Sequence, residues 1–171
     1  FSRHGIYYEV SATRKSGDPN TSCGNSYLNG SILSWMMAKH GIPKHHYASI
    51  VRGDDTVILI NEKYDLTVSD VERYYCSAGF KAKPKMFKDP RDASFCSQHF
   101  WPTQDGTVLG PKVGKLLCKI GWSHKFTETN LSHLRGVMMG LENCTSFIPV
   151  VRAYVSTTLR LTSKLQAQPH Y

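Results

Sequence analysis

Two adjacent carboxylates in the middle of the chain are its residues best suited to chemistry. Residues 50–60 read Ile-Val-Arg-Gly-Asp-Asp-Thr-Val-Ile-Leu-Ile. The two β-branched runs predict short strands joined at a four-residue polar tip, and Gly53 permits the bend. Asp54 and Asp55 at such a tip present the hard oxygen ligands that Mg²⁺ or Mn²⁺ prefers. A solvated Asp-rich turn has the same composition, so both interpretations stay open for this segment alone.

The elements upstream predict a second polar group within reach of this tip. Residues 22–40 suit a helix that begins with Thr21 or Ser22 as its N-cap. Its apolar residues recur at three- and four-residue steps, at Leu28, Ile32, Trp35 and Met36. Thr21 and Asn25 are four residues apart and so project from one side of the first turn. A helix of about 18 residues runs roughly 27 Å, and the residues that follow can extend back about 40 Å, so loop 16–22 and the tip can converge.

Downstream of the tip the sequence predicts further helices and one more hairpin. Ser69 and Glu72 fit a capping box for a short helix that ends at Gly79. The lysine-rich residues 80–88 suit a loop or an edge strand, because Pro84 disfavours a central strand. Residues 93–101 and 107–109 suit two strands of a hairpin. The predicted helices of the C-terminal third are residues 112–120, 130–142 and 146–165.

Composition limits the classes to which the protein can belong. The chain has 171 residues, 40% of them hydrophobic, which is ordinary for a globular domain. Its formal net charge of +8 suits an acidic partner such as nucleic acid. No apolar run reaches the ~18 residues of a membrane span. The five cysteines are widely spaced and odd in number, which favours free thiols in a reducing compartment. Cys96 and His99 are a candidate half of a zinc site, against the alternative of a packed thiol.

The order of these segments resembles the palm domain of RNA-dependent RNA polymerases of positive-strand RNA viruses. In that family a loop and helix of the form S-G-x-x-x-T-x-x-x-N precede a G-D-D hairpin. Residues 16–25, Ser-Gly-Asp-Pro-Asn-Thr-Ser-Cys-Gly-Asn, fit every fixed position. The next helix and the lysine-rich segment resemble motif D of the family, and residues 95–98, Phe-Cys-Ser-Gln, resemble its motif E hairpin. The resemblance covers nearly the whole chain, and its most specific part is the S-G loop followed by the G-D-D hairpin.

The resemblance implies an α+β fold with two parts. Residues 1–110 would form the polymerase palm, with antiparallel β-hairpins and packed helices, and residues 111–171 the start of a mostly helical thumb. The family also has a catalytic aspartate in a D-x-x-x-x-D motif, motif A, ahead of the S-G loop. Only fifteen residues precede Ser16, and none of them is aspartate. The resemblance therefore implies a piece of a larger polymerase, and we expect residues 1–171 alone to be inactive.

The resemblance also assigns roles to residues. Asp54 and Asp55 would bind the catalytic Mg²⁺ or Mn²⁺ ions of a two-metal mechanism, with Asp54 the stronger ligand. Asn25 would hydrogen-bond the ribose 2′-OH. The nucleotide-binding set is Ser16, Gly17, Thr21 and Asn25. The template or primer contacts are Gly53, Cys96 and Ser97. The candidate general acids for the leaving pyrophosphate are Lys81, Lys83, Lys85 and Lys88.

The implied function is RNA-directed RNA synthesis from rNTPs onto the 3′-OH of a growing RNA during viral genome replication. The implied partners are template and nascent RNA, rNTPs, the fingers and motif A of the same polymerase, and other viral replication proteins in a replication complex in the host cytoplasm. Two alternatives stay open. A reverse transcriptase palm also has an Asp-Asp turn, but usually with an aromatic residue where Arg52-Gly53 stands. A non-catalytic RNA-binding module derived from a palm would use the basic surface only.

Overall fold

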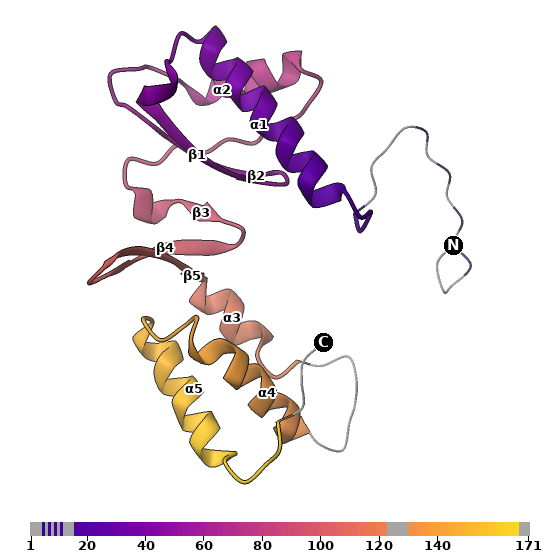
Figure 1. Cartoon of the computed structure of the whole chain (residues 1–171), viewed down its shortest axis with the longest axis vertical. Helices are drawn as coiled ribbons and strands as arrows, with labels where there is room; N and C mark the ends of the chain where they lie inside the picture. Colours follow the sequence, from indigo (N-terminus) through magenta and orange to yellow (C-terminus); the bar gives the residue numbers. More distant parts are fainter. Residues whose placement is uncertain are drawn as a thin grey trace. The chain divides into compact units, whose positions relative to one another are not determined.

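The computed structural model of the chain describes residues 5, 7, 9, 11, 16–122 and 130–167. These residues form helices interspersed with short antiparallel hairpins (Figure 1). The predicted α+β class is therefore confirmed. Residue contacts divide the chain into two compact units, an N-terminal unit, Phe1–Met86, and a C-terminal unit, Phe87–Tyr171. The assignment of palm and thumb to residues 1–110 and 111–171 stays a prediction.

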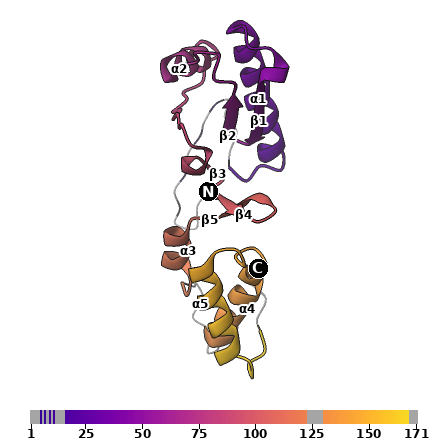
Figure 2. The same ribbon diagram turned by 90° about the vertical axis from the view of Figure 1, so that its left-hand side faces the viewer.

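The N-terminal unit contains a long helix, one hairpin and a short helix. Its elements are α1 (Thr21–Lys39), the 3₁₀ turn η1 (Lys44–His46), β1 (Tyr47–Arg52), β2 (Asp55–Ile60) and α2 (Val68–Ser77). The strands pair antiparallel, from Tyr47 opposite Ile60 to Arg52 opposite Asp55. Figure 1 shows the hairpin beside α1, and Figure 2 shows the same elements from the side. The helix predicted at residues 22–40 and the hairpin around Gly53 are confirmed.

The buried side of α1 includes the predicted Met36 but differs from the predicted side at other positions. Leu33, Met36 and Met37 are at most 2% exposed and form the core of this unit with residues of the hairpin and α2. Leu28 and Trp35, predicted to share the apolar side, are 43% and 39% exposed. Spacing by three and four residues admits more than one side of a helix, and the partners of α1 decide between them. Each fully buried apolar side chain contributes about 1.5–3 kcal/mol relative to an exposed one.

The N-caps also differ from those predicted. Asn20 is the N-cap of α1, in place of Thr21 or Ser22. The N-cap of α2 is Thr67, whose Oγ1 accepts from the Asp70 N–H at 3.2 Å while Asp70 Oδ2 accepts from the Thr67 N–H at 3.1 Å. The Thr67 hydroxyl also donates to Asp70 Oδ2 at 2.6 Å, and this bond, together with the one from the Thr67 N–H, lowers the pKa of Asp70. The capping box thus lies two residues before the predicted one.

Both Thr67-x-x-Asp70 and Ser69-x-x-Glu72 fit the capping pattern, so a neighbouring contact must choose between them. Leu66 precedes the Thr67 cap and is 4% exposed, and Val71 at the fourth helical position packs in the same cluster. This pair is a hydrophobic staple, which fixes the direction from which the chain enters the helix. The predicted stop at Gly79 is confirmed, since Gly79 has φ +83° and follows the C-cap.

The C-terminal unit combines a three-stranded sheet with three helices. Its elements are the 3₁₀ turn η2 (Pro90–Asp92), β3 (Ser94–Phe95), β4 (Gln98–Thr103), β5 (Gly106–Pro111), α3 (Val113–Lys119), α4 (Asn130–Glu142) and α5 (Pro149–Leu161). The sheet is antiparallel in the order β3-β4-β5. Helices α4 and α5 lie side by side around the buried Met138, Ile148, Val151 and Val155 (Figures 1 and 2). The structure confirms α4 with its predicted bounds. Helix α5 is shorter than the predicted 146–165: it begins at Pro149, because proline is favoured in a first helical turn, and it ends at Leu161.

The strand predicted at residues 93–101 is wrong, because a tight turn divides it. Cys96 and Ser97 join β3 to β4 with φ of 50° and 62°. Positive φ at both positions of a two-residue loop is the type I′ arrangement, for which Asn and Gly are the usual residues. Because Cys and Ser are not the usual residues of such a turn, the sequence does not predict it, and residues 93–101 instead predict one continuous strand.

Among the described residues, no helix has both the length and the apolar composition that a bilayer crossing requires.

We predict that Ser97→Gly stabilises the C-terminal unit by about 1 kcal/mol, because glycine avoids the cost of about 1–2 kcal/mol that an L-residue incurs in the left-handed region. The substitution also removes the exposed hydrogen bond from Lys115 Nζ to Ser97 Oγ (2.8 Å), whose loss costs less. Urea denaturation of the chain measures the difference. Ser94→Gly is the matched control in extended backbone, where glycine should destabilise by about 0.5–1 kcal/mol. A Ser97→Gly chain no more stable than the parent would contradict this strain.

Candidate active site

The two carboxylates lie where β1 turns into β2. Arg52 pairs with Asp55, so Gly53 and Asp54 alone form the loop, and Asp55 is the first residue of β2. The predicted four-residue tip is thus a two-residue turn. Gly53 has φ +63°, and a glycine at the first loop position is typical of a type II′ turn. Asp54 and Asp55 are both exposed. The hairpin therefore presents two neighbouring carboxylates to solvent on a short, well-defined turn.

Asn29 and Ser26 of α1 hold this turn. The Asn29 side-chain nitrogen, Nδ2, donates to the Gly53 carbonyl oxygen at 3.0 Å, to Thr56 Oγ1 at 2.8 Å and to the Asp54 carbonyl oxygen at 3.3 Å. The Gly53 N–H donates to Ser26 Oγ at 2.7 Å. Carbonyl oxygens only accept hydrogen bonds, so the amide nitrogen must face the turn. The three peptide groups that join residues 52 to 55 are thereby fixed from one helix.

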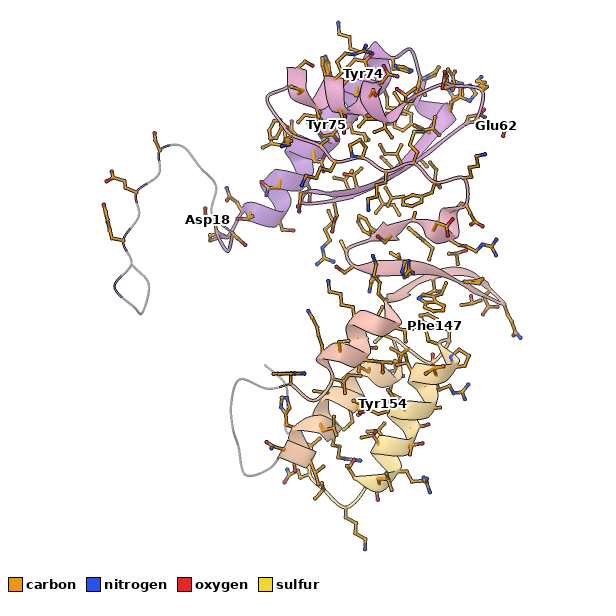
Figure 3. All side chains as sticks on the ribbon, turned by 180° about the vertical axis from the view of Figure 1, so that it is seen from behind. Asp18, Glu62, Tyr74, Tyr75, Phe147 and Tyr154 are labelled. Carbon is orange, nitrogen blue, oxygen red and sulfur yellow. The ribbon has the colours of Figure 1, made fainter. Side chains whose placement is uncertain are left out.

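Tyr75 of α2 completes the network. Its hydroxyl donates to Asn29 Oδ1 at 2.7 Å, on the side of the amide away from the turn. Figure 3 shows Tyr75 reaching from α2 toward α1. Burial raises the pKa of Tyr75, so its hydroxyl keeps its proton at neutral pH and stays a donor. Asn29 thus joins α1, the hairpin and α2 through one side chain. Ser26, Asn29 and Tyr75 were not predicted as site residues.

The predicted nucleotide-binding residues lie at the start of α1. Thr21 and Asn25 are half-buried in its first turns, and Ser16 and Gly17 are exposed in the turn that precedes it. Figure 3 shows Asp18, from the same loop, beside the start of the helix; the Asp18 carbonyl accepts from the Thr21 N–H at 3.0 Å. Thr21, Asn25 and Asn29 follow one another by four residues, each about 6 Å further along the axis. The hairpin tip contacts α1 at Ser26, the residue after Asn25, and at Asn29, one turn beyond Asn25.

The remaining predicted site residues fall into two groups. Lys81, Lys83 and Lys85 are exposed in an irregular segment of the N-terminal unit, which resolves the choice between loop and edge strand in favour of the loop. Lys88, Cys96 and Ser97 belong to the C-terminal unit. Of the predicted residues, the structure therefore brings together the Gly53–Asp54 turn and the helix that carries Thr21 and Asn25.

The residues of the turn fit a divalent cation in part. Asp54 and Asp55 supply hard oxygen ligands of the right chemistry, but Mg²⁺ demands an octahedral set. In residues 16–122 and 130–167 and the few described before them, no group of three or more His, Cys, Asp and Glu side chains is placed to hold a metal ion. The pair therefore needs further oxygen ligands, from water, substrate phosphates or another carboxylate.

An open cleft of about 720 Å³ lies between α1 and β1. Hydroxyl groups line most of it, and Lys44 supplies an ammonium group. The hydroxyl-bearing residues are Ser26, Tyr27, Ser31, Ser34, Tyr47 and Ser49. Hydroxyl and ammonium groups are donors for phosphate and sugar oxygens. The cleft shares Ser26 with the network that holds the turn.

Comparison with known proteins gives matches of one kind. A family model described as viral RNA dependent RNA polymerase matches residues 1–170. The chain is also 28% identical over 138 residues to the replicase large subunit of Youcai mosaic virus. That alignment covers 78% of this chain and 8% of the relative. The chain therefore spans a small part of the length of the curated relative that it matches.

Proposed function

The chain belongs to the viral RNA-dependent RNA polymerase family, and we propose that its Gly53-Asp54-Asp55 turn is the metal-binding part of an active site for RNA-directed RNA synthesis. The reaction transfers a nucleotide from an rNTP to the 3′-OH of a growing RNA in viral genome replication. The observation that carries the proposal is the exposed Asp54 carboxylate on a two-residue turn whose peptide groups are fixed to α1. A fixed turn limits the freedom of the carboxylates before any ligand binds.

Asp54 and Asp55 hold Mg²⁺ or Mn²⁺ in this proposal. Bound divalent ions would favour ionisation of the attacking 3′-hydroxyl and neutralise charge on the leaving pyrophosphate. Asp54 lies in the turn and Asp55 at the start of β2, so their side chains leave the backbone at different points. We assign the stronger metal contact to Asp54 and the adjacent, weaker one to Asp55.

Asn25 reads the sugar of the incoming nucleotide in this proposal. It is half-buried on α1, one turn from the Asn29 that contacts the turn. An amide side chain can both donate to and accept from a 2′-OH. Ser16, Gly17 and Thr21 would border the same nucleotide from the start of α1. One helix thereby brings the sugar contact close to the proposed metal-binding turn.

RNA contacts come from the basic surface and from polar turns. The net charge of +8 favours a phosphate backbone, and the cleft that contains Lys44 adds donors beside α1. We assign template or primer contacts to Gly53, Cys96 and Ser97. The candidate proton donors to pyrophosphate remain Lys81, Lys83, Lys85 and Lys88.

We further propose that this sequence works as part of a longer polymerase in a replication complex of the host cytoplasm. Two adjacent carboxylates cannot surround two divalent ions, so another segment must supply a third carboxylate and grip the triphosphate. The β1–β2 sheet has two strands in the part of the chain that the structure describes, and Ile50 and Leu59 are 47% and 56% exposed on it. An additional strand could pair at its edge and cover these side chains.

We predict that Asp54→Asn, in the polymerase that contains this sequence, lowers nucleotide incorporation on the order of 10²–10³-fold, the usual cost of removing a group that stabilises transition-state charge. RNA binding should persist, because phosphate contacts come from Lys and Arg. Primer extension and gel-shift assays measure the two effects. Asp105→Asn, the same change in the β4–β5 turn, is the matched control. Near-parental extension by Asp54→Asn would show that Asp54 is not a metal ligand on which catalysis depends.

We predict that Asn25→Ala lowers the preference for rNTPs over dNTPs by about 2- to 10-fold, which corresponds to one hydrogen bond of about 0.5–1.5 kcal/mol. Competition between the two nucleotide types in primer extension measures the ratio. The control is Asn20→Ala, since Asn20 precedes the helix and makes no side-chain capping bond. An unchanged ratio in Asn25→Ala would leave Asn25 a structural amide.

The 171-residue chain alone should not extend a primer with Mg²⁺ and rNTPs, because among its described residues no third carboxylate joins Asp54 and Asp55 in a group that could hold the metal ions. It should still bind RNA weakly, with an affinity that falls steeply as salt rises, because phosphate contacts release counterions. Filter binding across a salt series and primer extension test both points. A monomeric preparation that extends a primer would refute the need for another segment.

A further inference from the structure

We propose that Asn29 is a positioning residue for the metal site: its amide fixes the peptide groups of the Gly53–Asp54 turn and so sets the affinity of the Asp54 carboxylate for a divalent ion. This inference rests on the proposed function, since it assumes that Asp54 binds the metal. Asn29 itself contacts no carboxylate in the network described above. Its contacts are with two carbonyl oxygens and one hydroxyl of the hairpin.

Most hydrogen bonds between α1 and the turn involve main-chain atoms of the turn. Asn29 Nδ2 and Ser26 Oγ bind the main-chain groups of the turn, and Thr56 Oγ1 is the one side-chain partner on the hairpin. None of these four hydrogen bonds involves a carboxylate oxygen of Asp54 or Asp55. A cationic clamp, such as a lysine, would instead compete with the metal for the carboxylate. A neutral amide holds the turn without that competition.

The turn needs such a support because of its charges. Asp54 and Asp55 are adjacent and exposed, and like charges on neighbouring residues repel unless a cation lies between them. A turn at the end of a two-stranded sheet has few other restraints. Without a fixed backbone, the carboxylates could separate, and the metal would have to reassemble the site at a cost in affinity. The Asn29 network removes much of this freedom beforehand.

The two ends of the Asn29 amide bind in opposite directions. Nδ2 donates to the hairpin while Oδ1 accepts from the Tyr75 hydroxyl at 2.7 Å. Leucine has the volume but neither group, and aspartate lacks the donors. Tyr75 orients the amide from α2. Loss of its hydroxyl should therefore lower the metal affinity, as loss of the Asn29 amide should, but by a smaller factor.

The test is Mn²⁺ affinity, measured without nucleotide by the loss of the free Mn²⁺ electron paramagnetic resonance signal, in the polymerase that contains this sequence. For Asn29→Leu we expect the dissociation constant to rise about 10-fold, within the range for lost outer contacts of metal ligands. For Tyr75→Phe we expect a rise of about 2- to 5-fold, the equivalent of about one hydrogen bond. The Mg²⁺ concentration for half-maximal primer extension should rise in the same order, with RNA affinity unchanged.

Asn61→Leu is the matched control. Asn61 follows β2 at the other end of the hairpin, where its Oδ1 accepts from the Lys63 N–H at 3.1 Å. This control makes the same side-chain change and loses a hydrogen bond, so it reports a general loss of stability. Its Mn²⁺ affinity should equal that of the parent. An equal weakening in Asn61→Leu and Asn29→Leu would assign the effect to stability and overturn the proposal.

Two results separate this inference from the proposed function. If Asp54→Asn abolishes Mn²⁺ binding and extension while both Asn29→Leu and Tyr75→Phe keep the parental Mn²⁺ affinity, the positioning role is wrong and the proposed function stands. If Asp54→Asn keeps parental Mn²⁺ affinity and extension, the metal role of the turn is wrong. Should Asn29→Leu fail to fold, Tyr75→Phe and Thr56→Val, which each remove one hydroxyl of the network, decide the question in the same assay.

Discussion

The peptide groups of a two-residue turn must find hydrogen-bond partners, and in the N-terminal unit the side chains of one helix provide them. Asn29 and Ser26 satisfy Gly53 and the Asp54 carbonyl, and Tyr75 holds the other end of the Asn29 amide. Each such bond contributes only about 0.5–1.5 kcal/mol, less than one buried apolar side chain at about 1.5–3 kcal/mol. Together, the bonds of the network contribute about as much as one or two such side chains. Unlike burial, hydrogen bonds are directional, so they also determine where the turn points relative to α1.

The first half of helix α1 holds the turn, and its second half packs in the hydrophobic core. Thr21, Asn25 and Asn29 follow one another by four residues in its first half, and Leu33 and Met37 continue the same spacing into the core. Steps of four residues drift by about 40° around a helix of 3.6 residues per turn, so the row passes gradually from the exposed start of the helix to its buried side. The apolar end holds the helix against the hairpin and α2. The polar end fixes the turn through Asn29, and in our proposal it meets the nucleotide.

Local signals made part of this arrangement predictable. The β-branched runs around Gly53 and the long helix before them are strong patterns, and the structure confirms both. The network was not predictable, because Asn29 is 24 residues from Gly53 and 46 from Tyr75 in sequence, and an asparagine in mid-helix carries no signal of its partners. The choice of Thr67 over Ser69 as N-cap likewise depended on the burial of Leu66. The roles of Asp54, Asn25 and the lysines stay predictions, since a fold fixes positions and not substrates.

Two of the tight turns that the structure describes, at Gly53 and at residues 96–97, differ in which residues take a positive φ. At Gly53 the backbone has positive φ and the residue is glycine, so the bend itself costs little and only the next residue, Asp54, presents a side chain. At Cys96 and Ser97 both residues have positive φ and neither is glycine. Backbone strain of this kind persists where surrounding structure compensates for it, and it concentrates at functional sites. Lys115 binds Ser97 Oγ through an exposed hydrogen bond, which offsets little of the cost. The Gly53 turn thus presents one carboxylate at little backbone cost, whereas the turn at residues 96–97 presents two side chains at a cost that glycine would avoid.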